Sequence, residues 1–256
     1  MSIHETAIIH GSAEIGENVT IGPFSLVKEN VVIEAGVEIR ANAVIASNTK
    51  LGRNCKVFHG AVVGEIPQDL KFQGENTTTE IGENTVIREY VTIHRGTNDR
   101  LKTVIGRNCL IMAYAHVAHD CLLGDNVILA NAVNLAGHVT IEEYAILGGL
   151  VPVHQFVKIG KHSYIGGGFR VSKDVPPFIL ASSEPLAYSG LNIVGLRRRG
   201  FTSENRSLIK KAYRLIFRSE YNTSQALEQI KKDLPQTEEI QYIVDFVESS
   251  ERGIIG

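Results

Sequence analysis

The sequence predicts a mainly β protein, a parallel β-helix made of very short strands, followed by a small α-helical C-terminal region. An aliphatic residue recurs every sixth position, 26 times from Ile3 to Val171 with two interruptions. An α-helix needs an apolar period near 3.6 and a flat strand a period of 2, so neither element produces this pattern. Glycine often follows the aliphatic residue, and asparagine often stands three positions after it. Both tolerate a positive φ, so we expect each hexad to end in a corner.

Three hexads would close a triangular coil of 18 residues, and successive coils would stack at the strand spacing of about 4.8 Å. A series of hairpins fits poorly, because two-residue turns such as Asn-Gly or Asp-Gly are almost absent. A small or β-branched residue precedes nearly every repeated aliphatic residue by two positions, and Cys55, Cys109 and Cys121 all occupy that slot. Their spacing matches no zinc or disulfide framework, so we expect reduced cysteines in the core.

Two loops interrupt the repeat, at residues 64–80 and 94–103. Both keep the register, since every later aliphatic position is still a multiple of six from Ile3. Loops on a rigid scaffold often carry function. Asp69, Lys71, His94 and Arg95 are therefore candidates, although a solvated charge is the default interpretation for any one of them.

The repeat ends at Val171, and Pro176-Pro177 mark its exit. We divide the chain into a β-helix over residues 1–190 and a helical domain over 191–256. Ser203 is predicted to cap a helix, and further helices are expected over about 224–234 and 237–250. The apolar face of the first helix would be Leu208, Ala212, Leu215 and Ile216. That helix and the loop before it carry a basic patch that can attract an acidic partner or form a solvated face: Arg197, Arg198, Arg199, Arg206, Lys210, Lys211, Arg214 and Arg218.

Composition narrows the function classes. The 256 residues include 28 acidic and 26 basic side chains, so the surplus positive charge of a nucleic-acid binder is missing. The first residues lack the basic and apolar regions of a secretory signal, and no run of about eighteen apolar residues could span a membrane. We expect a cytoplasmic protein without a transmembrane segment.

The stretch AHVAHDC, residues 115–121, concentrates the reactive side chains. It places His116, His119 and Asp120 within five residues, a set that can transfer protons or bind a metal. With 18 residues in a coil, His119 lies beneath Gly137, and Asp120 beneath His138. The stretches AHVAHDC, LAGHV and VHQF would then meet at one corner of adjacent coils.

Acyl transfer needs a base for a hydroxyl proton, a donor for the developing oxyanion and groups that hold two substrates. His119 can be the base, with Asp120 or a nearby carbonyl orienting its ring. The N–H of Gly137 can be the donor, because the missing side chain lets a carbonyl approach closely. A structural alternative is that these residues form an external hydrogen-bonding ladder or a seam between subunits.

Seven motifs occur in the order QDLK, IHRGT, AHVAHDC, LAGHV, VHQF, DVPPF and GLRRRGF, and they resemble those of the hexapeptide-repeat acyltransferases over essentially the whole chain. The resemblance implies a left-handed β-helix, a homotrimer and no cofactor. It also implies transfer of a 3-hydroxyacyl group from acyl carrier protein to the glucosamine 3-hydroxyl of UDP-GlcNAc, the first step of lipid A biosynthesis, without a covalent enzyme intermediate.

The same resemblance implies roles for individual residues. His119 is the general base, Asp120 supports it and Gly137 supplies the oxyanion donor, while the basic helix meets the acidic carrier protein. Substrate contacts are implied for Asp69, Lys71, His116, His138, His154 and Gln155, and contacts with the nucleotide for Asn192, Arg198 and Arg199.

Gly167 stands where the family limits the length of the acyl chain. A side chain there shortens the accepted chain, so glycine predicts a long donor of about fourteen carbons or more. Mere corner geometry is the alternative interpretation of this glycine. Glu184-Pro185 and Val194 stand where family members can carry polar residues that contact substrate, which weakens the expected nucleotide contacts there.

Three other functions remain open. The N-acyltransferase that acts later in the same pathway usually carries an additional N-terminal domain, whereas the hexads here begin at Ile3. A zinc carbonic anhydrase on the same β-helix could use His116 and His119 as ligands, but this leaves Gly137, the Lys71 loop and the basic tail unexplained. A non-catalytic binding solenoid should tolerate His119→Ala.

Overall fold

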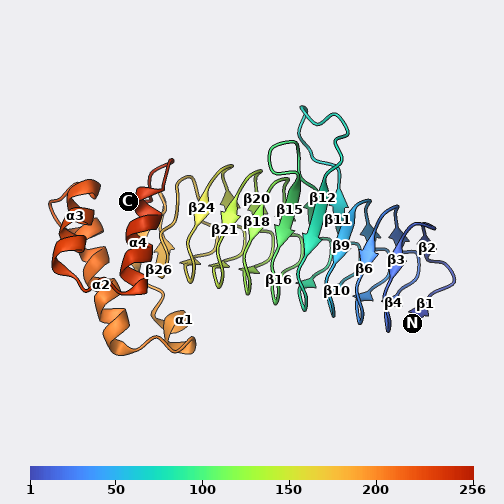
Figure 1. The fold of residues 1–256 in the computed structure, drawn as a ribbon, viewed down its shortest axis with the longest axis horizontal. Coiled ribbons are helices and arrows are strands. Elements are labelled where there is room, and N and C mark those ends of the chain that lie inside the picture. Colours follow the sequence, from blue (N-terminus) through green and yellow to red (C-terminus); the bar gives the residue numbers. More distant parts are fainter.

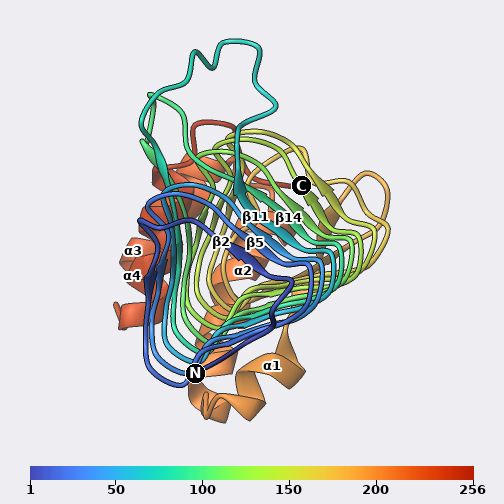
Figure 2. The ribbon, with the colours of Figure 1, turned by 90° about the vertical axis from the view of Figure 1, so that its right-hand side faces the viewer.

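The computed structural model describes all 256 residues and confirms the predicted fold class. The chain forms a left-handed parallel β-helix with four helices at its C-terminal end (Figure 1). Seen along the axis, the coils superimpose as a triangle with one sheet on each side (Figure 2).

The three sheets contain 11, 8 and 8 strands. The first sheet consists of β1 (Ser2–Ile3), β4 (Thr20–Ile21), β7 (Glu38–Ile39), β10 (Lys56–Val57), β13 (Val86–Ile87), β16 (Leu110–Ile111), β19 (Ile128–Leu129), β22 (Ile146–Leu147), β25 (Tyr164–Ile165), β26 (Ile179–Ser182) and β27 (Ala187–Leu191). The second consists of β2 (Ile8–Ile9), β5 (Leu26–Val27), β8 (Val44–Ile45), β11 (Val62–Glu65), β14 (Thr92–His94), β17 (His116–Val117), β20 (Asn134–Leu135) and β23 (Pro152–Val153). The third consists of β3 (Glu14–Ile15), β6 (Val32–Ile33), β9 (Thr49–Leu51), β12 (Thr78–Ile81), β15 (Lys102–Ile105), β18 (Leu122–Leu123), β21 (Thr140–Ile141) and β24 (Lys158–Ile159).

The 18-residue coil is visible in the strand register. His116 pairs with Asn134, and Asn134 with Pro152. Where the loops interrupt the repeat, Leu51 pairs with Ile81 and Ile81 with Ile105. The sequence separation between paired residues of adjacent coils therefore grows from 18 to 30 and then 24 residues. Because both are multiples of six, the aliphatic residues still point inward. The loops project together from one corner of the prism (Figure 1).

The corner residues only partly follow the expectation. Asparagines three positions after the aliphatic residue do adopt positive φ, as at Asn18 (57°) and Asn126 (58°). The glycines after the aliphatic residue, such as Gly16 and Gly124, do not. They are required for a different reason, since an added Cβ at either would lie 2.7 Å from the backbone of the next coil. Several functional candidates occupy the left-handed slot instead of asparagine, among them Asp120 (58°) and His138 (63°).

The interior is a column of aliphatic side chains with the small residues beside them. Ile45, Ile93 and Leu129 are among the largest side chains that are fully buried. Cys55, Cys109 and Cys121 are buried and unpaired, as predicted. Burial raises the pKa of each thiol, to about 11 for Cys55 and Cys109 and about 12 for Cys121. These thiols are therefore packing residues rather than nucleophiles.

The C-terminal end of the β-helix is covered by helices α1 (Ile193–Arg198), α2 (Ser203–Arg218), α3 (Thr223–Asp233) and α4 (Glu238–Glu248). The predicted cap at Ser203 is wrong by one position: Thr202 is the N-cap, and its side chain accepts a hydrogen bond from the N–H of Asn205. Tyr213 of α2 is fully buried and donates a hydrogen bond to the carbonyl of Pro177. None of the four helices has the length and apolarity needed to span a membrane.

Candidate active site

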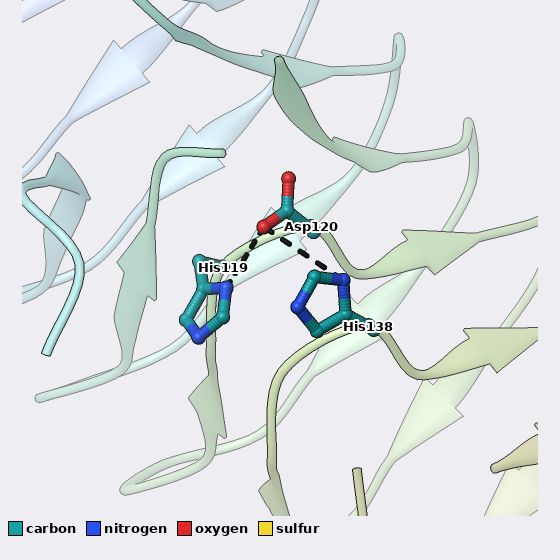
Figure 3. A group of neighbouring side chains, drawn as sticks. All are labelled: His119, Asp120 and His138. Atoms are coloured by element: carbon teal, nitrogen blue, oxygen red, sulfur yellow. Dashed lines mark hydrogen bonds and ion pairs between the residues drawn. The ribbon is translucent and has the colours of Figure 1, made fainter. Parts of the chain in front are cut away.

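The candidate site lies on the corner that joins the second and third sheets, where both loops emerge. His119 and Asp120 follow β17, Gly137 and His138 follow β20, and Phe156 follows β23. The structure therefore brings together the residues that the coil arithmetic placed on adjacent rungs. His119, Asp120 and His138 form the central group (Figure 3).

Asp120 is fully buried and is the centre of a hydrogen-bond network. Its carboxylate accepts bonds from the N–H of Thr97 (3.0 Å), the Thr97 hydroxyl (2.6 Å), the N–H of Arg100 (3.2 Å) and Nδ1 of His119 (2.8 Å). Burial by itself would raise the pKa of Asp120, but the hydrogen bonds from His119 and Thr97 outweigh it and hold the pKa at about 2. The group is thus a permanent anion at neutral pH.

A carboxylate at Nδ1 fixes the tautomer of His119, because that nitrogen must carry the proton. The other ring nitrogen, Nε2, then has its lone pair free, and it makes no hydrogen bond within the chain. The side chain of His119 is 15% exposed, enough for a substrate to reach it. This is the geometry of a general base with a supporting carboxylate.

Gly137 leaves the space that the ring of His119 occupies. A Cβ on residue 137 would lie 2.5 Å from Cε1 and 2.7 Å from Nε2 of His119. The N–H of Gly137 donates to no atom of the chain, as is common at this corner position. What distinguishes Gly137 is that this free donor lies beside a free imidazole nitrogen.

His138 lies one coil further on. Its Nδ1 is 3.0 Å from Oδ2 of Asp99 and 3.9 Å from Oδ2 of Asp120. Its ring stacks on Phe156, with centroids 4.4 Å apart, and meets the ring of His119 edge-on at 5.0 Å. Aromatic contacts on two sides therefore fix the plane of this imidazole.

His116 points outward from β17, and its Nδ1 is 2.7 Å from the hydroxyl of Thr92. The edge of His94 packs against it, with ring centroids 4.9 Å apart. Burial lowers the pKa of His94 to about 4 and also lowers that of His116, so both rings are neutral. His94 and Arg95, for which a solvated charge was the default expectation, are buried at the start of the loop over residues 94–103.

The two loops enclose a cavity of about 310 Å³ beside His138. Asp69 and Lys71 contribute to its wall, and Asn98 bridges the loops through a 3.0 Å hydrogen bond to Glu75. The full lining is Asp69, Lys71, Phe72, Glu75, Thr97, Asn98, Asp99, His138 and Phe156. Charged and hydrogen-bonding groups over an aromatic floor suit a polar ligand such as a sugar nucleotide.

The predicted nucleotide residues lie elsewhere in the monomer, around α1. Asn192 is the N-cap of that helix, and its amide also donates to the carbonyl of His162 at 2.9 Å. Arg198 lines an apolar cavity of about 330 Å³ together with Val194, whose side chain offers no hydrogen bond. The guanidinium of Arg199 lies 4.8 Å from the ring centroid of Tyr144. Within one chain, nothing places these residues in the loop cavity.

At the next corner position His154 is half-buried and Gln155 is exposed, and Nδ1 of His154 lies 3.1 Å from the carbonyl of Gln155. Gly167 is exposed on the corner that joins the first and second sheets. It faces Gly149 of the preceding coil, whose carbonyl would be 3.1 Å from an added Cβ.

The central group could also be considered as a metal site, because ligand atoms of His119, Asp120 and His138 lie within 4.8 Å of one another. However, Oδ2 of Asp120 already accepts two hydrogen bonds. A cation there would displace the proton that His119 donates. The zinc alternative proposed His116 and His119, but His116 is not among the residues whose ligand atoms gather here. The arrangement favours proton transfer.

Sequence patterns did not identify Thr97, Asp99, Arg100 or Phe156 as site residues. The first three lie in a loop without periodicity, and their contacts with the corner span 20 or more residues. Phe156 could have been found, because it follows Asp120 and His138 in the same 18-residue column.

The chain combines a left-handed β-helix of hexapeptide repeats with a hydrogen-bonded histidine and aspartate next to a glycine. This combination defines a hexapeptide-repeat transferase. Two family models agree: "Bacterial transferase hexapeptide (six repeats)" matches residues 102–137, and "Udp N-acetylglucosamine O-acyltransferase; Domain 2" matches residues 174–255.

Relatives and solved structures narrow the class. The acyl-(acyl-carrier-protein)–UDP-N-acetylglucosamine O-acyltransferase of Thiobacillus denitrificans is 48% identical over 255 residues, which cover 99% of each chain. The solved UDP-N-acetylglucosamine acyltransferase of Bacteroides fragilis is 50% identical with a TM-score of 0.97, and that of Campylobacter jejuni 38% identical with a TM-score of 0.94, each covering 99% of both chains. The chain therefore belongs to the family of UDP-N-acetylglucosamine O-acyltransferases.

Proposed function

We propose that this protein transfers a 3-hydroxyacyl chain from acyl carrier protein to the glucosamine 3-hydroxyl of UDP-GlcNAc, the first step of lipid A biosynthesis. Family membership supports the reaction class. The observation that carries the mechanism is His119, whose Nδ1 is held at 2.8 Å by the buried Asp120 and whose Nε2 is unpartnered beside Gly137.

In the proposed reaction, Nε2 of His119 takes the proton of the sugar hydroxyl as its oxygen attacks the thioester carbonyl. The anionic Asp120 stabilises the resulting imidazolium. The N–H of Gly137 donates to the oxygen that becomes negatively charged. When the tetrahedral intermediate collapses, the C–S bond breaks and the imidazolium returns the proton to the departing thiolate. No side chain forms a covalent bond with the acyl group.

The acceptor would occupy the loop cavity, with His138, Asp69 and Lys71 around it and His116 beside the attacking hydroxyl. His154 and Gln155 would contact the substrates from the next coil. Asn192, Arg198 and Arg199 would hold the nucleotide. They lie around α1 and not in the loop cavity of their own chain, so they would contact a nucleotide bound in the loop cavity of a neighbouring subunit.

A homotrimer is supported by the apolar surface next to the corner that joins the first and second sheets. This corner carries exposed Phe24, Tyr90, Tyr114 and Leu150, and the rings of Tyr90 and Tyr114 stack with centroids 5.4 Å apart. A row of large exposed apolar residues on a β-helix corner is typical of a subunit interface. A partner there would cover the second sheet, which lies between this corner and His119.

Acyl carrier protein would dock on α2. Lys210, Arg214 and Arg218 line an open hollow of about 610 Å³ together with Tyr188 and Gly190, and a basic hollow attracts an acidic partner. Gly167 would leave the acyl groove open, so the preferred donor has about fourteen carbons or more. With these substrates, the reaction would take place in the cytoplasm.

The decisive experiment is a transfer assay with UDP-GlcNAc and a panel of 3-hydroxyacyl carrier proteins on the wild-type protein and His119→Ala. We expect acyl transfer by the wild type and a loss of at least about 10³-fold in kcat for the variant. Turnover unaffected by the substitution would refute the mechanism. Stoichiometric zinc with activity lost on chelation would instead support the carbonic anhydrase alternative.

A further inference from the structure

A second carboxylate in the site belongs to the loop over residues 94–103, and it gives His138 a partner of its own. We propose that Asp99 is a positioning residue: it holds the proton on Nδ1 of His138, so that Nε2 accepts a hydrogen bond from the acceptor sugar. This inference rests on the proposed function and goes beyond it, because it assigns the protonation state of a second imidazole.

The turn that carries Asp99 is anchored on Asp120. The N–H groups of Thr97 and Arg100 donate to Oδ1 of Asp120 at 3.0 and 3.2 Å, and the Thr97 hydroxyl donates to Oδ2 at 2.6 Å. The guanidinium of Arg100 also donates to the backbone carbonyl of Asp120 at 2.8 Å. Because these contacts hold the turn on both sides of Asp99, they aim its side chain at the neighbouring coil.

Asp99 is the better partner for His138 than Asp120. Oδ2 of Asp99 is 3.0 Å from Nδ1 of His138, whereas Oδ2 of Asp120 is 3.9 Å away and already accepts bonds from His119 and Thr97. The two imidazoles of the central group, His119 and His138, therefore have separate carboxylates at Nδ1. His119 has the buried one and His138 the exposed one.

The pairing between Asp99 and His138 can tighten when the acceptor binds. The oxygen of Asp99 lies off the direction of the ring N–H, so Nδ1 of His138 has no aligned hydrogen bond. Phe156 and His119 fix the ring plane, but the Asp99 side chain is 61% exposed and can rotate. Hydrogen bonds of this kind are often poorly aligned before a ligand closes the site.

The tautomer decides what His138 offers the substrate. With the proton on Nδ1, Nε2 is an acceptor for a hydroxyl or amide N–H. Nε2 of His138 makes no hydrogen bond within the chain, and the ring lines the loop cavity. Without the carboxylate, the proton is free to move to Nε2, which then becomes a donor and no longer matches the same substrate group.

Steady-state kinetics on Asp99→Ala, Asp99→Asn and Asp99→Glu tests the proposal. For Asp99→Ala we expect the KM for UDP-GlcNAc to rise about tenfold, the loss typical of a hydrogen bond to a charged group. The kcat should stay within about twofold of wild type. Asp99→Glu should restore most of the affinity, and Asp99→Asn should resemble Asp99→Ala. Glu80→Gln is the matched control, because Glu80 is an exposed carboxylate at the root of the other loop and pairs with Lys102 rather than a histidine.

A double-mutant cycle with His138→Ala separates positioning from direct substrate contact. If Asp99 acts through His138, Asp99→Ala adds nothing in the His138→Ala background. Additive losses would overturn the proposal, as would an unchanged KM in Asp99→Ala.

The ¹⁵N chemical shifts of His138 with UDP-GlcNAc bound provide an independent measurement, in which the Nδ1–H form of the wild type should be lost in Asp99→Ala. If His119→Ala abolishes transfer while Asp99→Ala has wild-type kinetics, only this inference fails. If His119→Ala remains active, the proposed function fails.

Discussion

Asp120 combines the left-handed backbone conformation of the corner slot with a buried charge. Its φ of 58° lies in the left-handed region, which is unfavourable by about 1–2 kcal/mol for a residue with a Cβ. Four hydrogen bonds to its carboxylate offset that strain. The corner conformation and these bonds together hold one carboxylate between His119 and the turn that carries Asp99.

Replacing Asp120 with Asn tests the supporting carboxylate. Asparagine is neutral and cannot stabilise an imidazolium, so we expect kcat to fall by about 10²–10³-fold.

The same variant tests how Asp120 contributes to stability in acid. Because the pKa of Asp120 is about 2 in the folded protein and about 3.9 in an unfolded chain, its carboxylate contributes about 2 kcal/mol above pH ~4.

That contribution disappears as the pH falls from about 4 to 2, because the unfolded chain takes up the proton first. Denaturant titrations at pH 7 and pH 3 should therefore show a larger acid-induced loss for the wild type than for Asp120→Asn. An equal loss in both proteins would contradict the assignment.

Gly137→Ala should disable the proposed base, His119, without unfolding the protein. The added methyl would lie 2.5 Å from Cε1 of His119, so the ring must leave its position. We expect kcat to fall by at least about 10²-fold, since small displacements of a catalytic group have effects of this size. Gly11 occupies the same corner slot in the first coil, where an added Cβ meets nothing within 4 Å, so Gly11→Ala is the control. Similar losses in both variants would indicate a general effect on the corner.

At the scale of the element, most corners from Asn18 onward contain one residue in the left-handed conformation. Asn126 has this role between β18 and β19, with φ of 58°, and its N–H donates to the carbonyl of Arg107 at 2.9 Å. Asn131 is an exposed asparagine on another corner without positive φ. The two residues therefore separate backbone conformation from side-chain chemistry.

We expect Asn126→Ala to lower the free energy of unfolding by about 1 kcal/mol, because alanine is disfavoured at positive φ. Asn131→Ala should stay within about 0.5 kcal/mol of the wild type. Equilibrium denaturation of both variants measures the difference. A smaller effect at Asn126 than at Asn131 would mean that the left-handed backbone does not limit stability.

The strands and corners could be predicted from the sequence, whereas the path of the loop that carries Asp99 could not, and the difference has a physical cause. A repeat of Ile, Val and Leu every six residues determines strands and corners, because only a coil of three hexads buries all of them. The same arithmetic placed Gly137 above His119. It could not assign a partner to His138, because Asp99 reaches it from a loop whose path depends on contacts with Asp120. It also attributed Gly16 and Gly124 to positive φ, whereas the close approach of the next coil requires them.

At the scale of the molecule, the site and the proposed subunit interface occupy different corners of the prism. The loops and His119 lie between the second and third sheets, and Tyr114, Leu150 and Gly167 lie between the first and second. The second sheet connects the two corners, and its outward-facing residues include His116, Asn134 and Pro152. The acyl chain of a donor whose thioester lies beside His119 would follow this sheet toward Gly167 if a second subunit covers it.

Gly167→Met tests that path. A methionine side chain at this exposed corner would fill the end of the groove, and Gly149 must shift slightly because its carbonyl would be 3.1 Å from the new Cβ. Each methylene that loses its burial weakens discrimination by about 0.8 kcal/mol. We therefore expect the ratio of kcat/KM for fourteen-carbon over ten-carbon 3-hydroxyacyl donors to fall at least about tenfold. Retained turnover of the ten-carbon donor serves as the internal control for folding. Equal losses for both donors would mean that the chain does not end at Gly167, and the predicted preference of the wild type for long donors would then need another cause.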